Sequence, residues 1–259
     1  MTAQLARISS LLLLGAMAFG LLGCTSASQT QATRRRDDAS NYNMQLGISY
    51  LNRGDLGLAK EKLDRALAEN PRDPNVHSAR AMLEDRLGHS DLADKEFKEA
   101  LDLGPRSPDI LNNYAVYLCR TGRIDEGVKS FEEAAHNALY RTPEAAYTNA
   151  GVCLRGAKRD NEAAMSFQRA LQVKSNFAEA AYQLADLDFA RGEVQLARDT
   201  VDQFMASFDP TPDLLLIGVR LSRKQGDRLA EERFARRLRM DFPASDQARA
   251  LAELSHNPG

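Results

Sequence analysis

Small and apolar side chains recur along the chain with a period near 34 residues. One column holds only alanine or glycine, with steps of 34, 34, 36, 34 and 33 residues: Gly47, Ala81, Ala115, Gly151, Ala185 and Gly218. A second small column and a mostly aromatic third column keep the same steps: Ala59, Ala93, Gly127, Ala163, Ala197 and Ala230, then Leu63, Phe97, Phe131, Phe167, Val201 and Phe234. Such a period predicts a stack of helix–turn–helix units.

The first unit, residues 40–73, shows how the pattern sets the two helices. Gly47 and Tyr50 share one face of the expected first helix, and Gly54 makes the turn. Ala59 and Leu63 share one face of the expected second helix. Small side chains at these positions let the two helices approach closely, while the larger apolar ones fill the space beside them.

Two irregularities interrupt the repeat. The step of 36 places two extra residues around Leu139 to Pro143, between the third and fourth units. The fourth unit also has Lys158 where a turn glycine is expected. After the sixth unit, Asp246 is the expected N-cap of a last helix that covers the exposed end of the stack.

These columns resemble the tetratricopeptide repeat, with six units over residues 40–244. The resemblance implies an all-α fold, a right-handed superhelical solenoid of about six helix–turn–helix repeats. Residues 245–259 are expected to form the C-terminal capping helix and tail, which keeps the end of a solenoid soluble. Stacks of this kind are usually protein-binding scaffolds.

The beginning of the chain has the pattern of an export signal. Residues 8–22 are apolar or small apart from two serines, a run shorter than the roughly 20 residues that span a bilayer. The run ends in Leu21-Leu22-Gly23-Cys24, which resembles a bacterial lipoprotein box. This implies removal of residues 1–23 and acylation of Cys24. An ordinary secretory signal with a chance cysteine is the alternative.

The segment after Cys24 bears on location. Thr25 follows the cysteine, and by analogy with lipoprotein sorting the absence of aspartate there favours the outer membrane. A lipid-anchored protein on the periplasmic face of that membrane is therefore expected. Residues 24–39 are polar with little apolar content, so we expect a lipidated, flexible tether.

Composition and motifs argue against catalysis and against nucleic acid. The net charge of −2 gives no basic excess for nucleic acid. The chain has no Gly-rich phosphate loop, HExxH pair or GxSxG elbow, and its four histidines are scattered. We expect no catalytic residues, metal site, cofactor or small-molecule substrate. A hydrolase or solute binder with a distributed polar pocket is the alternative of a different class.

Cys119 and Cys153 lie on the expected first helices of the third and fourth units, at nearly equivalent offsets. Neighbouring first helices pack side by side in this architecture, and an exported protein sits where disulfides form. A Cys119–Cys153 bridge is therefore one expectation. The alternative is that both are buried thiols that act as small apolar residues.

The concave face, lined by the first helix of each unit, is the expected groove for a partner. It should show a mixture of apolar and polar side chains: Asn112, Val116, Thr148, Arg155, Tyr182, Asp186 and Phe189. Asn113 and Asn149 occupy the same place in successive units, where an amide can satisfy local polar groups. The mixture has no dominant charge, so it favours a peptide or protein segment over a polyanion.

Three stretches, together with the lipoprotein box and the six units, resemble the PilF/PilW family of type IV pilus biogenesis lipoproteins. They are residues 112–123, residues 139–153, and residues 214–221 with Phe242-Pro243. The resemblance implies a pilotin that helps subunits of the secretin, a ring-shaped channel, to reach the outer membrane and form multimers. The alternative in the same class is a repeat lipoprotein that serves outer-membrane protein assembly or cell-wall enzymes.

Overall fold

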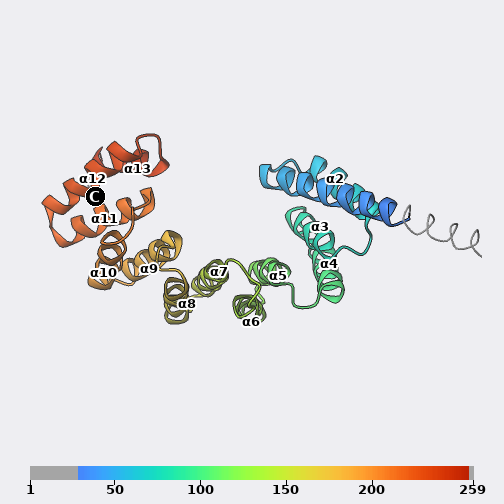
Figure 1. Cartoon of the computed structure of the whole chain (residues 1–259). Helices are drawn as coiled ribbons and strands as arrows, with labels where there is room; N and C mark the ends of the chain where they lie inside the picture. The colour runs from blue at the N-terminus through green and yellow to red at the C-terminus, as the bar shows by residue number, and fades with distance from the viewer. Residues whose placement is uncertain (1–28, 257–259) are drawn as a thin grey trace, which may run out of the picture. The chain divides into compact units, whose positions relative to one another are not determined.

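The computed structural model describes residues 29–256, and within that range the regular structure is entirely helical (Figure 1). The first helix covers residues 29–53 of the described part. It is followed by α2 (Leu56–Glu69), α3 (Pro74–Arg86), α4 (Ser90–Leu103), α5 (Pro108–Arg120), α6 (Ile124–Ala135), α7 (Pro143–Gly156), α8 (Asp160–Val173), α9 (Ala178–Ala190), α10 (Val194–Met205), α11 (Pro212–Gln225), α12 (Arg228–Asp241) and α13 (Asp246–His256). The predicted all-α repeat fold is confirmed.

The helices belong to two compact units, one ending at Pro105 and the other beginning at Arg106. In the first unit, residues 29–53 and α2 form one helical pair, and α3 and α4 form the next. Leu51 and Leu63 are buried in a core that α3 completes with Ala79 and Leu83. The core of this unit therefore joins two successive repeats.

Residues 29–39 differ from the flexible tether that their composition predicts, because they are helical. They form the N-terminal part of the first helix, and nearly all of their side chains are exposed. Asn70 Nδ2 donates a hydrogen bond to Asp37 Oδ1 at 3.0 Å and so connects this part to the end of α2. The hydroxyl of Ser40, which is fully buried, donates to the carbonyl of Ala66 at 2.9 Å. A helix nucleated by the packed turns after Ser40 propagates easily through the alanines, glutamines and arginines before it.

The second unit contains four further pairs, α5 with α6, α7 with α8, α9 with α10, and α11 with α12, and then α13. A large buried cluster lies at its C-terminal end and includes Val201, Leu215 and Phe234. Leu251 of α13 is 2% exposed and belongs to the same cluster, so the last helix covers the end of the core.

The cap of α13 differs from the sequence prediction by one residue. Ser245 Oγ, not the Asp246 side chain, accepts the hydrogen bond from the Ala248 amide, at 3.1 Å. Asp246 lies in the first turn, where a negative charge favours the helix dipole, and it pairs with Arg249. Serine and aspartate are both common N-cap residues, so residue type alone does not decide whether Ser245 or Asp246 caps the helix.

The alanine and glycine column is explained by contact between the two helices of one unit. A Cβ placed on Gly151 would lie 2.4 Å from Phe167 Cε1, and one on Gly218 would lie 2.8 Å from Phe234 Cδ1. The aromatic column supplies the rings that fill this contact, and Phe167 is fully buried. The two columns therefore specify the tight pairing of the first and second helices.

The turns inside the units need a left-handed backbone. Gly54 has φ of +83° and Gly122 has φ of +84°, a region that glycine enters at little cost. Lys158 occupies the corresponding position of the fourth unit and has φ of +63°. The fourth unit keeps the turn geometry without the glycine.

Candidate protein-binding face

The first helices of the second unit lie side by side in sequence order. Contacts join α5 to α7, α7 to α9, α9 to α11 and α11 to α13. The structure joins α5 to α7 covalently through a disulfide between Cys119 and Cys153, whose Cα atoms are 5.7 Å apart. Neighbouring first helices thus present one continuous face, on which most of the residues expected in the groove are found.

Two asparagines connect α5 to α7 on this face. Asn149 Nδ2 donates a hydrogen bond to Asn112 Oδ1 at 3.1 Å, and both side chains are partly exposed. Asn113, the neighbour of Asn112, is also partly exposed and has an interaction of its own. The bond gives a structural role to Asn149, one member of the expected column of Asn113 and Asn149, and the remaining donors and acceptors of the Asn112 and Asn149 amides stay available.

A charged cluster connects α7, α9 and α11. Arg155 Nη2 lies 2.7 Å from Asp186 Oδ2, and Arg220 Nη1 lies 3.3 Å from Asp186 Oδ1. The Arg155 guanidinium also donates to Gln183 Oε1 at 3.3 Å. One carboxylate is therefore shared by two guanidinium groups, which leaves the cluster with a local excess of positive charge.

Aromatic side chains border this cluster. The Arg220 guanidinium lies over the ring of Phe189, 4.9 Å from its centroid. Tyr182 is partly buried one turn before Asp186, and burial, followed by the charges of Asp186 and Asp213, raises the pKa of its phenol. Even an ordinary phenol, with a pKa of about 10, is protonated at neutral pH, so the hydroxyl can donate a hydrogen bond. Cations beside aromatic faces are common in interfaces between proteins.

The apolar part of the face differs from the prediction in one residue. Val116 is 46% exposed, as expected for a groove residue. Thr148 is only 3% exposed, and its hydroxyl donates to the Glu144 carbonyl inside α7, so its assignment to the groove is wrong. The hydrogen bond within its own helix satisfies the Thr148 hydroxyl, so this short side chain stays buried without a partner from outside α7.

Three residues of the face were missed by the sequence reasoning, although the repeat step locates the first of them and helix spacing the second. Val152 is 47% exposed and follows Val116 by one step of 36 residues. Gln183 precedes Asp186 by three positions on the same helix. Arg220 is one position past the repeat equivalent of Asp186, which is Val219, and its ion pair with Asp186 places it on the face. We define the first-helix face as Asn112, Val116, Asn149, Val152, Arg155, Tyr182, Gln183, Asp186, Phe189 and Arg220.

The chemistry of this face suits a polypeptide. A hollow of about 470 Å³ borders the disulfide and Val152, which gives an apolar side chain a place to enter. Amides, two arginines and an aspartate surround the apolar positions and can orient a peptide.

No group of three potential metal-ligating side chains occurs within residues 29–256. None of the helices in that range is long and apolar enough to span a bilayer. Cys24 lies outside the described residues.

Comparison with known proteins gives consistent relatives. A model of the tetratricopeptide repeat matches residues 44–108 and, in an overlapping match, residues 78–146. The type IV pilus assembly protein PilF of Pseudomonas aeruginosa is 30% identical over 232 residues, covering 88% of this chain and 92% of PilF. The resemblance inferred from the sequence is therefore confirmed at the level of pilus biogenesis.

Two solved structures agree with this relationship. A structure from the functional characterization of P. aeruginosa PilF has a TM-score of 0.63 and 29% identity, and covers 84% of this chain and 98% of its own. PilW, described as a widely conserved type IV pilus biogenesis factor, has a TM-score of 0.64 and 26% identity, with coverage of 82% and 98%.

The repeats and the relatives together define the class of protein. Tetratricopeptide repeats form interaction scaffolds, and this chain is a non-catalytic scaffold whose partners are proteins. Identity of 30% over nearly all of both sequences establishes the relationship with PilF. The chain belongs to the PilF/PilW family of tetratricopeptide-repeat proteins of type IV pilus biogenesis.

Proposed function

We propose that this protein is a pilotin, a lipid-anchored scaffold on the periplasmic face of the outer membrane that helps secretin subunits to localise there and to form multimers. The observation that carries the proposal is membership of a pilus biogenesis family combined with the lipoprotein box that ends in Cys24. Membership of the family indicates a role in pilus biogenesis, and the lipoprotein box indicates anchoring to a membrane.

Each part of the chain has a physical task in this proposal. Acyl chains on Cys24 hold the protein at the membrane, and more than one chain is needed for stable anchoring. The first-helix face binds a segment of a secretin subunit through Val116, Val152 and the Arg155–Asp186–Arg220 cluster. Joining an anchor and a binding face on one chain raises the concentration of subunits at the membrane, which favours their assembly.

Binding of the purified secretin to the full-length protein tests the partner. We expect Val116→Glu with Val152→Glu to weaken binding by about tenfold or more, because two charges replace the apolar contacts of the face. Val173→Glu is the matched control, since Val173 is similarly exposed at 51% but lies at the end of α8, outside the face. Equal secretin binding by wild type and the double variant contradicts the assignment of the face, and no binding by wild type contradicts the choice of partner.

A further inference from the structure

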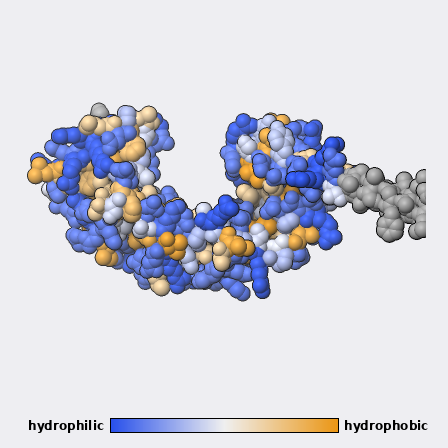
Figure 2. Space-filling view, in the orientation of Figure 1, coloured by the Kyte–Doolittle hydropathy of each residue, from blue (hydrophilic) through white to orange (hydrophobic). Residues whose placement is uncertain are grey.

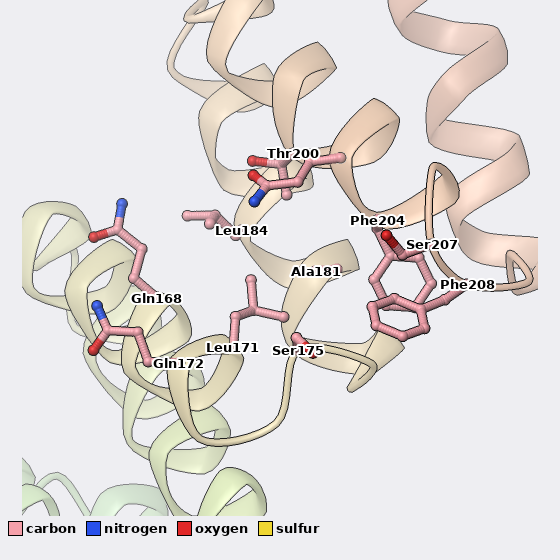
Figure 3. A pocket seen from close by; sticks show the side chains of 11 residues that line it. Gln168, Leu171, Gln172, Ser175, Ala181, Leu184, Thr200, Phe204, Ser207 and Phe208 are labelled. Atoms are coloured by element: carbon pink, nitrogen blue, oxygen red, sulfur yellow. The ribbon is translucent and has the colours of Figure 1, made fainter.

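A second concave surface lies between α8 and α10, on the second helices of the fourth and fifth repeats (Figure 3). The groove has a volume of about 470 Å³, within the range of ligand-binding pockets. Leu171, Ala181 and Leu184 form its apolar floor, and Phe204 and Phe208 close one end. The first-helix face shares no residue with it.

The walls of this groove are polar and carry no charge. The amides and hydroxyls come from α8, from α10 and from the segments that follow them: Gln168, Gln172, Ser175, Thr200, Gln203 and Ser207. None of these side chains has a hydrogen bond or ion pair with another group of residues 29–256. Figure 2 shows that the visible surface is mostly hydrophilic. Charged residues make up 27% of the chain, and none of them lines this groove.

The equivalent positions one repeat earlier lie between α6 and α8, and their side chains are charged. There Arg169 Nη1 lies 2.9 Å from Glu132 Oε1, so an ion pair joins the two second helices. Gln168 follows Glu132 by the 36-residue step, and Gln203 follows Arg169 by the 34-residue step. Two glutamines therefore replace the ion pair in the next gap, and the groove between α8 and α10 stays open.

We propose that this groove binds an extended, uncharged segment of a partner polypeptide that carries an aromatic or leucine side chain. A peptide backbone offers both N–H donors and carbonyl acceptors, and amide and hydroxyl side chains can satisfy both kinds of group. The apolar floor takes one large side chain. A charged segment would lose its hydration without gaining an ion pair, so the walls select against it. The assignment is independent of which protein binds the first-helix face.

Selection from a phage-displayed library of random nonapeptides tests this inference on the full-length protein. We expect enrichment of sequences without Asp, Glu, Lys or Arg that contain Phe, Tyr, Trp or Leu. Gln168→Glu with Gln203→Arg should install the ion pair of the preceding gap and weaken the selected peptide by at least tenfold in fluorescence polarisation. Thr200→Trp should have the same effect by filling the groove from one wall, and it does not depend on formation of an ion pair.

The matched control is the reverse exchange, Glu132→Gln with Arg169→Gln, which removes the ion pair between α6 and α8 and should leave peptide affinity within twofold of wild type. Circular dichroism checks that every variant keeps its helical content. Failure to enrich any sequence overturns the inference, as does enrichment of charged peptides. Selected peptides that bind the two groove variants as tightly as wild type also overturn it, because they occupy another surface.

Discussion

At the scale of single residues, the turn of the fourth repeat holds a lysine in a conformation that glycine prefers. Lys158 has φ of +63°, whereas glycine supplies the same turn at Gly88 and Gly122. A side chain in the left-handed region costs roughly 1–2 kcal/mol, and the greater chain entropy of unfolded glycine offsets about half of that.

We therefore expect Lys158→Gly to increase the free energy of unfolding by about 0.5–1 kcal/mol. Urea unfolding followed by circular dichroism measures the change. Lys158→Ala is the control, because it removes the charge and keeps a side chain in the left-handed region. A gain as large for alanine as for glycine would show that charge, not backbone conformation, is responsible.

Asp188 is a second departure, because it occupies a column that leucine fills in three of the other five repeats, with Tyr50 and Glu84 in the remaining two. Leu118, Leu154 and Leu221 stand at the equivalent position and are at most 2% exposed, and Asp188 is only 6% exposed. Burial, and then the charge of Glu193, raises the pKa of the Asp188 carboxyl against the opposing effect of Arg191. The folded state therefore disfavours the charged form.

The sign of the pH effect follows from this direction. Because the pKa of Asp188 is higher in the folded state, the folded protein keeps this proton at pH values where the unfolded chain has already lost it. The free energy of unfolding that Asp188 contributes is therefore fully present below about pH 4 and decreases as pH rises through the raised pKa. We expect Asp188→Asn to raise the melting temperature at pH 7 and to remove this decrease, as measured by thermal unfolding at several pH values. A variant less stable than wild type at pH 7 would contradict the account.

At the scale of elements, the contact between a small residue and an aromatic ring fixes each helical pair. Gly151→Ala places a methyl group 2.4 Å from the nearest Phe167 ring atom, so α7 and α8 must separate or the ring must move. We expect a loss of about 1–3 kcal/mol in the free energy of unfolding, a typical cost of overpacking.

The double variant Gly151→Ala with Phe167→Leu separates this mechanism from general loss of helix stability. Alanine favours helix over glycine by roughly 1 kcal/mol, so removing the ring should make the alanine substitution less harmful than it is beside Phe167. Chemical denaturation of the four members of this cycle gives the coupling between the two positions. Additive effects would contradict a direct clash.

The disulfide is the second device that acts on elements, because it joins α5 to α7 across 34 residues. Chain-entropy models give a loop of this length about 3–4 kcal/mol. We expect Cys119→Ser with Cys153→Ser to lower the free energy of unfolding by that order, and dithiothreitol to destabilise wild type but not the double variant. Equal stability of reduced and oxidised wild type would contradict a role for the bridge in holding the two repeats together.

The sequence predicted those helices whose packing residues recur at the repeat period. The columns around Gly151 and Phe167 located the paired helices, because close approach demands a small residue opposite a large one. The helical state of residues 29–39 was not predictable from their polar composition, since it depends on a neighbouring packed helix. The burial of Thr148 and the groove beside Gln168 depend on distances between repeats, which no single repeat encodes.

At the scale of the whole molecule, two kinds of surface are offered by the repeats of the second unit. The first-helix face presents arginines, amides and exposed valines, and the groove between α8 and α10 presents uncharged polar walls over an apolar floor. A scaffold with two chemically different sites can hold two segments of partner protein at once, and the combined affinity then exceeds that of either site.

The proposed pilotin role is tested most directly by the ratio of secretin multimers to monomers in outer-membrane fractions, separated by gel electrophoresis. We expect that a strain lacking this protein accumulates monomers, that the wild-type gene restores multimers, and that Cys24→Ala fails to restore them at equal protein level. A normal multimer fraction in the deletion strain would contradict the pilotin role.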